Sequence, residues 1–169
     1  MPTNTRTPAV DWVKRHANLN PEKIALFDLS TEATFSFNSL DRRIDTLSTY
    51  LVSCGVCKGD RVAFLSFNSS SVIEIILSCW RVGAICLPIN YRLSASEIVY
   101  IVTDAEPKIM FVDGEFNPVW NEALKEINKL TTVNINSLST ISEYENIMKN
   151  FSPYVKSYEK FFDEQCMLM

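Results

Sequence analysis

Two patterns of apolar residues alternate along this chain: stretches with apolar residues three or four positions apart, and short uninterrupted apolar runs. The first pattern is typical of helices with one buried face, and the second of strands buried on both faces. Residues 38–54 show the first pattern and predict a helix with Asn38 as its N-cap and Gly55 just beyond its end. The apolar stripe of this helix consists of Leu40, Ile44, Leu47 and Leu51.

The same alternation continues as far as residue 135. Strands are predicted at 61–67, 84–87, 108–112 and 131–135, and helices at 71–82, 95–104 and 118–130. Gly83 is placed to end a helix, and the pairs Ser71–Glu74 and Ser94–Glu97 predict capping boxes at two helix starts. We therefore predict an α/β fold, a mostly parallel sheet with helices on both faces.

The chain divides into three regions. Residues 1–37 are expected to form a tail, a short helix over about 8–17 and a small hairpin. Residues 38–135 form the α/β subdomain, and residues 136–169 form a loop-rich connection with a helical turn or two, ending in an apolar strand. The hairpin strands are 23–28 and 34–37, and the final strand is 166–169.

Composition narrows the class of function. The 169 residues are 47% hydrophobic and carry a formal net charge of −4, which argues against nucleic acid or an anionic membrane surface as a partner. Five cysteines, an odd number, suit a reduced, cytoplasmic protein. We expect no signal peptide and no transmembrane segment, because the N-terminus lacks an apolar core and the most apolar window, 72–89, contains Glu74 and Arg81.

Two features could carry chemistry, and both have a simpler interpretation. Cys54 and Cys57 form a C-x-x-C pair, but a redox thiolate is stabilised at a helix N-terminus and Cys54 falls at a predicted C-terminus. A zinc site would need a second such pair. His16 is the only histidine, beside Lys14 and Arg15 on the polar side of a short helix, so we expect a solvated surface residue. No catalytic or metal-binding residue is predicted.

The order of elements and several motifs resemble the N-terminal portion of the adenylate-forming (AMP-binding) superfamily, and acyl-CoA synthetases (fatty-acid–CoA ligases) in particular. The matching segments are TFSFNSLDRRIDTLSTYL, GVCKGDRVAFLSFNSSSVIEIILSCWRVGAICLPINYRLSASEIVYIV and TDAEPKIMFVD. The loop Asn90-Tyr91-Arg92-Leu93 is more like that of acyl-CoA and aryl-CoA ligases than that of peptide-synthetase adenylation domains, whose equivalent loop usually begins with Asp.

This resemblance implies an ATP-dependent reaction. A carboxylic acid, fatty or aryl, would attack ATP with Mg²⁺ to give an acyl-adenylate and pyrophosphate, and the thiol of CoA would then displace AMP. In this family the Gly-rich phosphate-binding loop follows a strand like 166–169, and the ATP, Mg²⁺ and catalytic segments lie further on. We therefore expect an N-terminal fragment that is inactive alone. The alternative is a non-enzymatic half-domain that serves as a partner-binding or homodimerisation module.

Asn90, Tyr91 and Arg92 are the candidate binding residues. The resemblance implies that the CoA nucleotide lies near this loop, where the Arg92 guanidinium could meet a phosphate. In the other interpretation, Asn90 caps a turn and Arg92 pairs with Glu97 or a nearby acid. Some relatives carry basic residues after the strand at 108–112, but this chain has Asp113-Gly114-Glu115-Phe116, which weakens the CoA prediction there.

The region 136–169 is rich in aromatic residues. We interpret them as a face that would cover the rest of a larger enzyme, and such a face would favour association when exposed. These residues are Phe151, Tyr154, Tyr158, Phe161 and Phe162.

Overall fold

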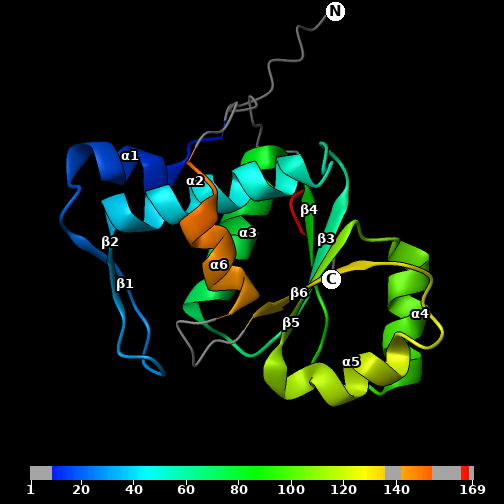
Figure 1. The fold of residues 1–169 in the computed structure, drawn as a ribbon. Helices are drawn as coiled ribbons and strands as arrows, with labels where there is room; N and C mark the ends of the chain where they lie inside the picture. Colours follow the sequence, from blue (N-terminus) through cyan, green and yellow to red (C-terminus); the bar gives the residue numbers. More distant parts are fainter. Residues whose placement is uncertain (1–8, 136–141, 154–164, 168–169) are drawn as a thin grey trace, which may run out of the picture.

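A computed structural model describes residues 9–135, 142–153 and 165–167 (Figure 1). Its centre is a four-stranded sheet in the order β4-β3-β5-β6, and every pairing within it is parallel. The strands are β3 (Arg61–Leu65), β4 (Ile85–Pro88), β5 (Ile109–Asp113) and β6 (Thr131–Ile135). These short apolar runs lie where the sequence predicts strands, so the α/β prediction is confirmed.

Helices cover both faces of the sheet (Figure 1). Side chains alternate along each strand, so that Val62 and Phe64 of β3 pack on one face while Ala63 and Leu65 pack on the other. The first face is covered by α2 (Phe37–Ser53), α3 (Ser70–Val82) and α6 (Glu143–Asn150), and the second by α4 (Ala95–Ala105) and α5 (Asn117–Ala123). Each face therefore has its own hydrophobic core.

The N-terminal elements lie outside the layer made by α2. Helix α1 (Trp12–Leu19) contacts α2, and β1 (Ile24–Phe27) pairs antiparallel with β2 (Thr34–Ser36), which confirms the predicted hairpin. The helix starts later than predicted because Asp11, whose side chain accepts a hydrogen bond from the backbone N–H of Lys14, is its N-cap.

Several predicted helix ends are wrong by a few residues. Helix α2 is capped by Ser36, two residues before the predicted Asn38, and α3 is capped by Ser69. Helix α5 ends at Ala123 rather than at 130. The Ser94–Glu97 capping box and the left-handed Gly83 (φ 75°) after α3 are confirmed.

The predicted Ser71–Glu74 capping box does not form. Both residues lie within α3 and are buried, and the Glu74 carboxylate binds Arg43 of α2 instead. Arg43 also binds Glu145 of α6, and the Tyr144 hydroxyl donates to Glu74 (2.7 Å). Burial raises the pKa of Glu74, and Arg43 opposes this shift. This network joins three helices across about a hundred residues of sequence, which no local motif can predict.

A second network holds α1, α2 and α3 together. Arg81 of α3 is 6% exposed, and its guanidinium donates to the carboxylates of Asp11, Asp41 and Asp45. Lys14 of α1 adds a second cation beside Asp41 and Asp45. The charged groups of this network therefore pair with one another and hold the three helices together.

The C-terminal region agrees in part with the sequence. The predicted helical turns correspond to α6, and Met167 pairs parallel with Cys86 of β4, whose N–H donates to the carbonyl of Cys166 (2.9 Å). Phe151 packs edge-on against Tyr50. The other aromatic residues of the predicted face lie outside the described residues.

Candidate functional site

The carboxyl ends of β3, β4 and β5 bring three loops to one edge of the sheet. Open α/β sheets bind ligands at this edge. The β4 loop holds the predicted residues: the Asn90 side chain accepts a hydrogen bond from the N–H of Arg92 (3.1 Å), and its carbonyl accepts one from the N–H of Leu93 (3.1 Å). Asn90 therefore shapes a turn that presents Tyr91 and Arg92.

Arg92 does not pair with Glu97. The Glu97 carboxylate accepts hydrogen bonds from the N–H (2.8 Å) and the hydroxyl (2.7 Å) of Ser94, which closes the capping box. The Arg92 guanidinium instead lies over the ring of Tyr91, 5.3 Å from its centroid. Within the part of the chain that the structure describes, Arg92 forms no ion pair, so its charge is available to a ligand.

Tyr91 belongs to a cluster of three aromatic rings. Its centroid lies 4.7 Å from that of Phe67, which follows β3, and 5.8 Å from that of Phe116, which follows β5, and the two phenylalanine rings are 4.8 Å apart. Phe116 is 8% exposed, but Phe67 and Tyr91 are 40% and 38% exposed. We call Phe67, Tyr91 and Phe116 the aromatic cluster.

Sequence reasoning missed Phe67 and Phe116 as site residues. Each stands two or three residues after the end of a strand, as Tyr91 does, and that common position is the signal that could have found them. Their contact depends on β3 lying between β4 and β5, and strand order is not visible in the pattern of apolar residues.

The end of β5 is acidic and polar. Asp113 is buried, and its Oδ2 atom accepts a hydrogen bond from the Ser66 hydroxyl (3.4 Å), whereas Glu115, two residues further on, is exposed. Asn134 of β6 donates to the side chain of Asn117 (3.2 Å). This end of the edge thus carries an exposed negative charge at Glu115, whereas the other end carries the exposed positive charge of Arg92.

The N-terminus of α3 also lies at this edge, and the chain fills it with its own carboxylate. Asp28, at the end of β1, accepts hydrogen bonds from the N–H of Ser70 (2.9 Å) and from the hydroxyl (2.6 Å) and N–H (3.0 Å) of Ser30. Burial alone would raise the pKa of Asp28, but these hydrogen bonds outweigh it and hold the pKa well below its usual range. Asp28 thus stands where an α/β protein often binds an anion.

The remaining candidates have structural places. Cys54 is the C-cap of α2, as the sequence predicts, and both Cys54 and Cys57 are exposed. His16 is half-buried and stacks on Phe37 (4.8 Å between centroids), so the prediction of a solvated histidine is wrong.

Among the described residues, no three His, Cys, Asp or Glu side chains come together in a way that could hold a metal ion. Likewise, no helix in the described ranges has the length and apolar character needed to cross a membrane.

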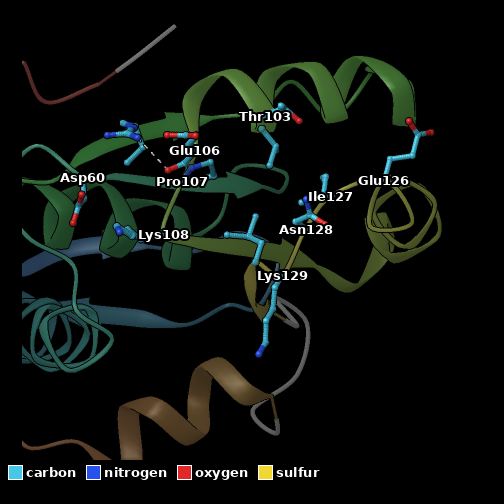
Figure 2. A pocket seen from close by; sticks show the side chains of 12 residues that line it. Asp60, Thr103, Glu106, Pro107, Lys108, Glu126, Ile127, Asn128 and Lys129 are labelled. Carbon is cyan, nitrogen blue, oxygen red and sulfur yellow. Dashed lines mark hydrogen bonds between the residues drawn. The ribbon is translucent and has the colours of Figure 1, made fainter.

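A hollow of about 540 Å³ lies at the opposite, amino edge of the sheet (Figure 2). It is lined by the starts of β3, β5 and β6 and by the end of α4, and its charged residues balance: Asp60, Glu106 and Glu126 against Arg61, Lys108 and Lys129. The Arg61 guanidinium donates hydrogen bonds to the backbone carbonyls of Gly59, Ala105 and Glu106. The bonds to Ala105 and Glu106 cap the C-terminus of α4. No convergent unsatisfied group marks this hollow as a binding site.

Comparison with known proteins defines the class. Residues 13–162 match the family model of the AMP-binding enzyme. The chain therefore belongs to the AMP-binding enzyme family.

Among curated relatives, the chain is 32% identical over 106 residues to the indoleacetate–CoA ligase of Aromatoleum aromaticum, covering 63% of this chain and 20% of that protein. It is 30% identical over 149 residues to the peroxisomal butyrate–CoA ligase AAE11 of Arabidopsis thaliana, covering 88% of this chain and 26% of that protein. The chain thus spans about a quarter or less of the length of these relatives.

Solved structures share the fold. An anthranilate CoA ligase, AuaEII, in complex with anthranoyl-AMP superposes with a TM-score of 0.83 at 22% identity, covering 96% of this chain and 31% of that one. A Mycobacterium tuberculosis fatty acyl CoA synthetase superposes with a TM-score of 0.79 at 22% identity, covering 92% of this chain and 30% of that one. The described α/β unit corresponds to a part of those larger chains.

Proposed function

We propose that this chain forms the N-terminal part of an acyl-CoA synthetase, a ligase that joins a carboxylic acid to CoA. In the first step the carboxylate attacks the α-phosphate of ATP, which gives an acyl-adenylate and releases pyrophosphate. In the second step the CoA thiol attacks the acyl carbon and AMP leaves. The observation that carries the proposal is the similarity to a butyrate–CoA ligase over 88% of this chain.

The described residues serve as scaffold in this proposal. None of them is assigned a catalytic role, and ATP and Mg²⁺ would be bound by other parts of the enzyme, so the chain alone is inactive. CoA would touch the loop of Asn90, Tyr91 and Arg92, because the Arg92 guanidinium is the cation at the carboxyl edge that no described acid neutralises.

The acid is proposed to be a fatty or aryl acid. Relatives are named for both kinds, butyrate and indoleacetate. The proposal also includes a cytoplasmic location, which the reduced cysteines of the described residues suit, and leaves open a homodimer.

The first step of the test is to sequence the transcript, in which we expect the reading frame to continue past the codon for Met169 into a loop rich in Thr, Ser and Gly. The second step is an assay of the encoded protein, which should release AMP when given ATP, Mg²⁺, CoA and a panel of fatty and aryl acids. The 169-residue chain alone should show only background pyrophosphate–ATP exchange. Exchange catalysed by the chain alone would contradict the assignment of all catalytic groups to other parts.

A partner-binding or dimerisation module is the second candidate. The exposed rings of Phe67 and Tyr91 are the observation that favours it, since exposed aromatic clusters also mark protein contacts. A native stop codon directly after Met169, together with a dimer in analytical ultracentrifugation, would favour this candidate over the ligase.

A further inference from the structure

We propose that Phe67 and Phe116 are positioning residues for Arg92, acting through the ring of Tyr91, in a site that binds the phosphorylated nucleotide of the thiol acceptor. This inference rests on the proposed function, because it takes the nucleotide of CoA as the ligand. It adds two residues, from two other loops, to the three that the sequence predicts.

The contacts form one chain from the core to the guanidinium. Phe116 is anchored in the core beneath α4 and α5, and its ring lies 4.8 Å from that of Phe67. Both rings lie against Tyr91, at 4.7 Å for Phe67 and 5.8 Å for Phe116, and the Arg92 guanidinium lies over Tyr91 at 5.3 Å. The loops after β3 and β5 thus fix the ring that holds a charge on the loop after β4.

This arrangement matters because an exposed arginine otherwise samples many rotamers. Ordering a long side chain on binding weakens affinity, and a guanidinium held in place beforehand avoids that loss. Two features of the turn act together: Asn90 fixes the backbone of Arg92 by its hydrogen bond to the N–H, and Tyr91 fixes the side chain.

The exposure of the rings indicates a surface that is built for contact. Phe116 is buried, whereas the two rings that contact it, Phe67 and Tyr91, are 40% and 38% exposed side by side at the ligand edge of the sheet, and adjoining exposed apolar groups are typical of contact surfaces. The exposed charges also differ along this edge, since the exposed Glu115 after β5 disfavours a phosphate there and the exposed Arg92 after β4 favours one.

The test measures binding of adenosine 3′,5′-bisphosphate to the chain by isothermal titration calorimetry. Arg92→Ala should weaken binding about tenfold, as loss of a charge-assisted hydrogen bond does. Phe67→Ala should weaken it about three- to fivefold, and Phe67→Tyr should restore affinity. Tyr100→Ala, which removes a tyrosine that is 74% exposed on α4, is the matched control and should leave binding unchanged.

A double variant separates positioning from direct contact. In the Arg92→Ala background, Phe67→Ala should have no further effect, because Phe67 acts through Arg92. An undiminished effect in that background would overturn the positioning role. Full affinity in Phe67→Ala and in Phe116→Leu, each folded by circular dichroism, would also overturn it while leaving the CoA ligase proposal intact.

The same titration separates the two proposals. A wild-type chain that does not bind the bisphosphate overturns the nucleotide site itself. An enzyme that forms AMP with an acid and CoA but shows no loss in Arg92→Ala retains the proposed function and rejects this site.

Discussion

Arg81 and Arg92 lie in two regions of the molecule that use the same side chain in opposite ways. Arg81 is 6% exposed between α1, α2 and α3, and three aspartates accept its hydrogen bonds. Arg92 lies exposed at the carboxyl edge, over the ring of Tyr91, and no described acid pairs with it. The first arginine holds helices together, and the second is the one for which we propose a ligand.

Removing Arg81 should give the largest loss of stability. Arg81→Ala leaves Asp41 and Asp45 with Lys14 as their partner among the described residues and removes the ion pair of Asp11, and breaking a buried ion pair costs about 4 kcal/mol. The free energy of unfolding in urea measures this. Lys125→Ala, which breaks the exposed pair with Glu122, is the control and should change it by about 0.5 kcal/mol or less. Equal losses in both variants would contradict the structural role of Arg81.

The network around Arg43 should respond to a smaller change. Tyr144→Phe removes the hydroxyl that donates to Glu74 (2.7 Å) and keeps the ring in the core. A hydrogen bond to a charged acceptor contributes about 2 kcal/mol, so unfolding should require correspondingly less urea. Tyr100→Phe, on the exposed face of α4, is the matched control. An unchanged midpoint in Tyr144→Phe would show that Glu74 is satisfied by Arg43 alone.

The contact between Asp28, at the end of β1, and the N-terminus of α3 should make the stability of the fold depend on pH. Because the pKa of Asp28 is lowered in the folded chain, its contribution is fully present above the ordinary carboxyl pKa of about 4 and is lost as the pH falls below it. Asp28→Asn should therefore be less stable than the wild type at pH 7, by about 1 kcal/mol, and this difference should shrink progressively as the pH falls below about 4 toward the lowered pKa of Asp28. Thermal unfolding across this range measures the difference. A constant gap at every pH would show that the carboxylate charge is not involved.

Replacing Arg92 should have the smallest effect on stability. Exposed substitutions that break no ion pair change the free energy of unfolding by about 0.5 kcal/mol or less, so Arg92→Ala should melt like the wild type. Differential scanning calorimetry checks this. A loss close to that of Arg81→Ala would remove the contrast between the two regions.

Local patterns in the sequence predicted most of the fold. The stripe of Leu40, Ile44, Leu47 and Leu51 is buried as expected, and the strand runs lie in the sheet. The Ser94–Glu97 box formed, whereas the same signature at Ser71–Glu74 did not. A carboxylate can cap its own helix only if it has no stronger hydrogen-bond partner. Glu74 has such a partner in the guanidinium of Arg43, which lies 31 residues away in the sequence.

The candidate site was predicted less completely for the same reason. Asn90, Tyr91 and Arg92 lie on one turn, so a motif can indicate them. Phe67 and Phe116 meet Tyr91 only because the strand order is β4-β3-β5, which depends on how distant segments pack. The periodicity of apolar residues predicts the helices and strands, but it does not predict which strands lie next to one another.

The measurement that tests the account most directly is mapping of CoA onto the chain by NMR. Backbone amide resonances should shift in the loops after β3, β4 and β5, strongest at Tyr91 and Arg92 and weaker at Phe67 and Phe116. Thr103, Lys108 and Asn128, which line the hollow at the amino edge, should not move. Shifts confined to that hollow, or no shifts in the wild type at saturating CoA, would contradict the carboxyl edge as the site of the thiol acceptor.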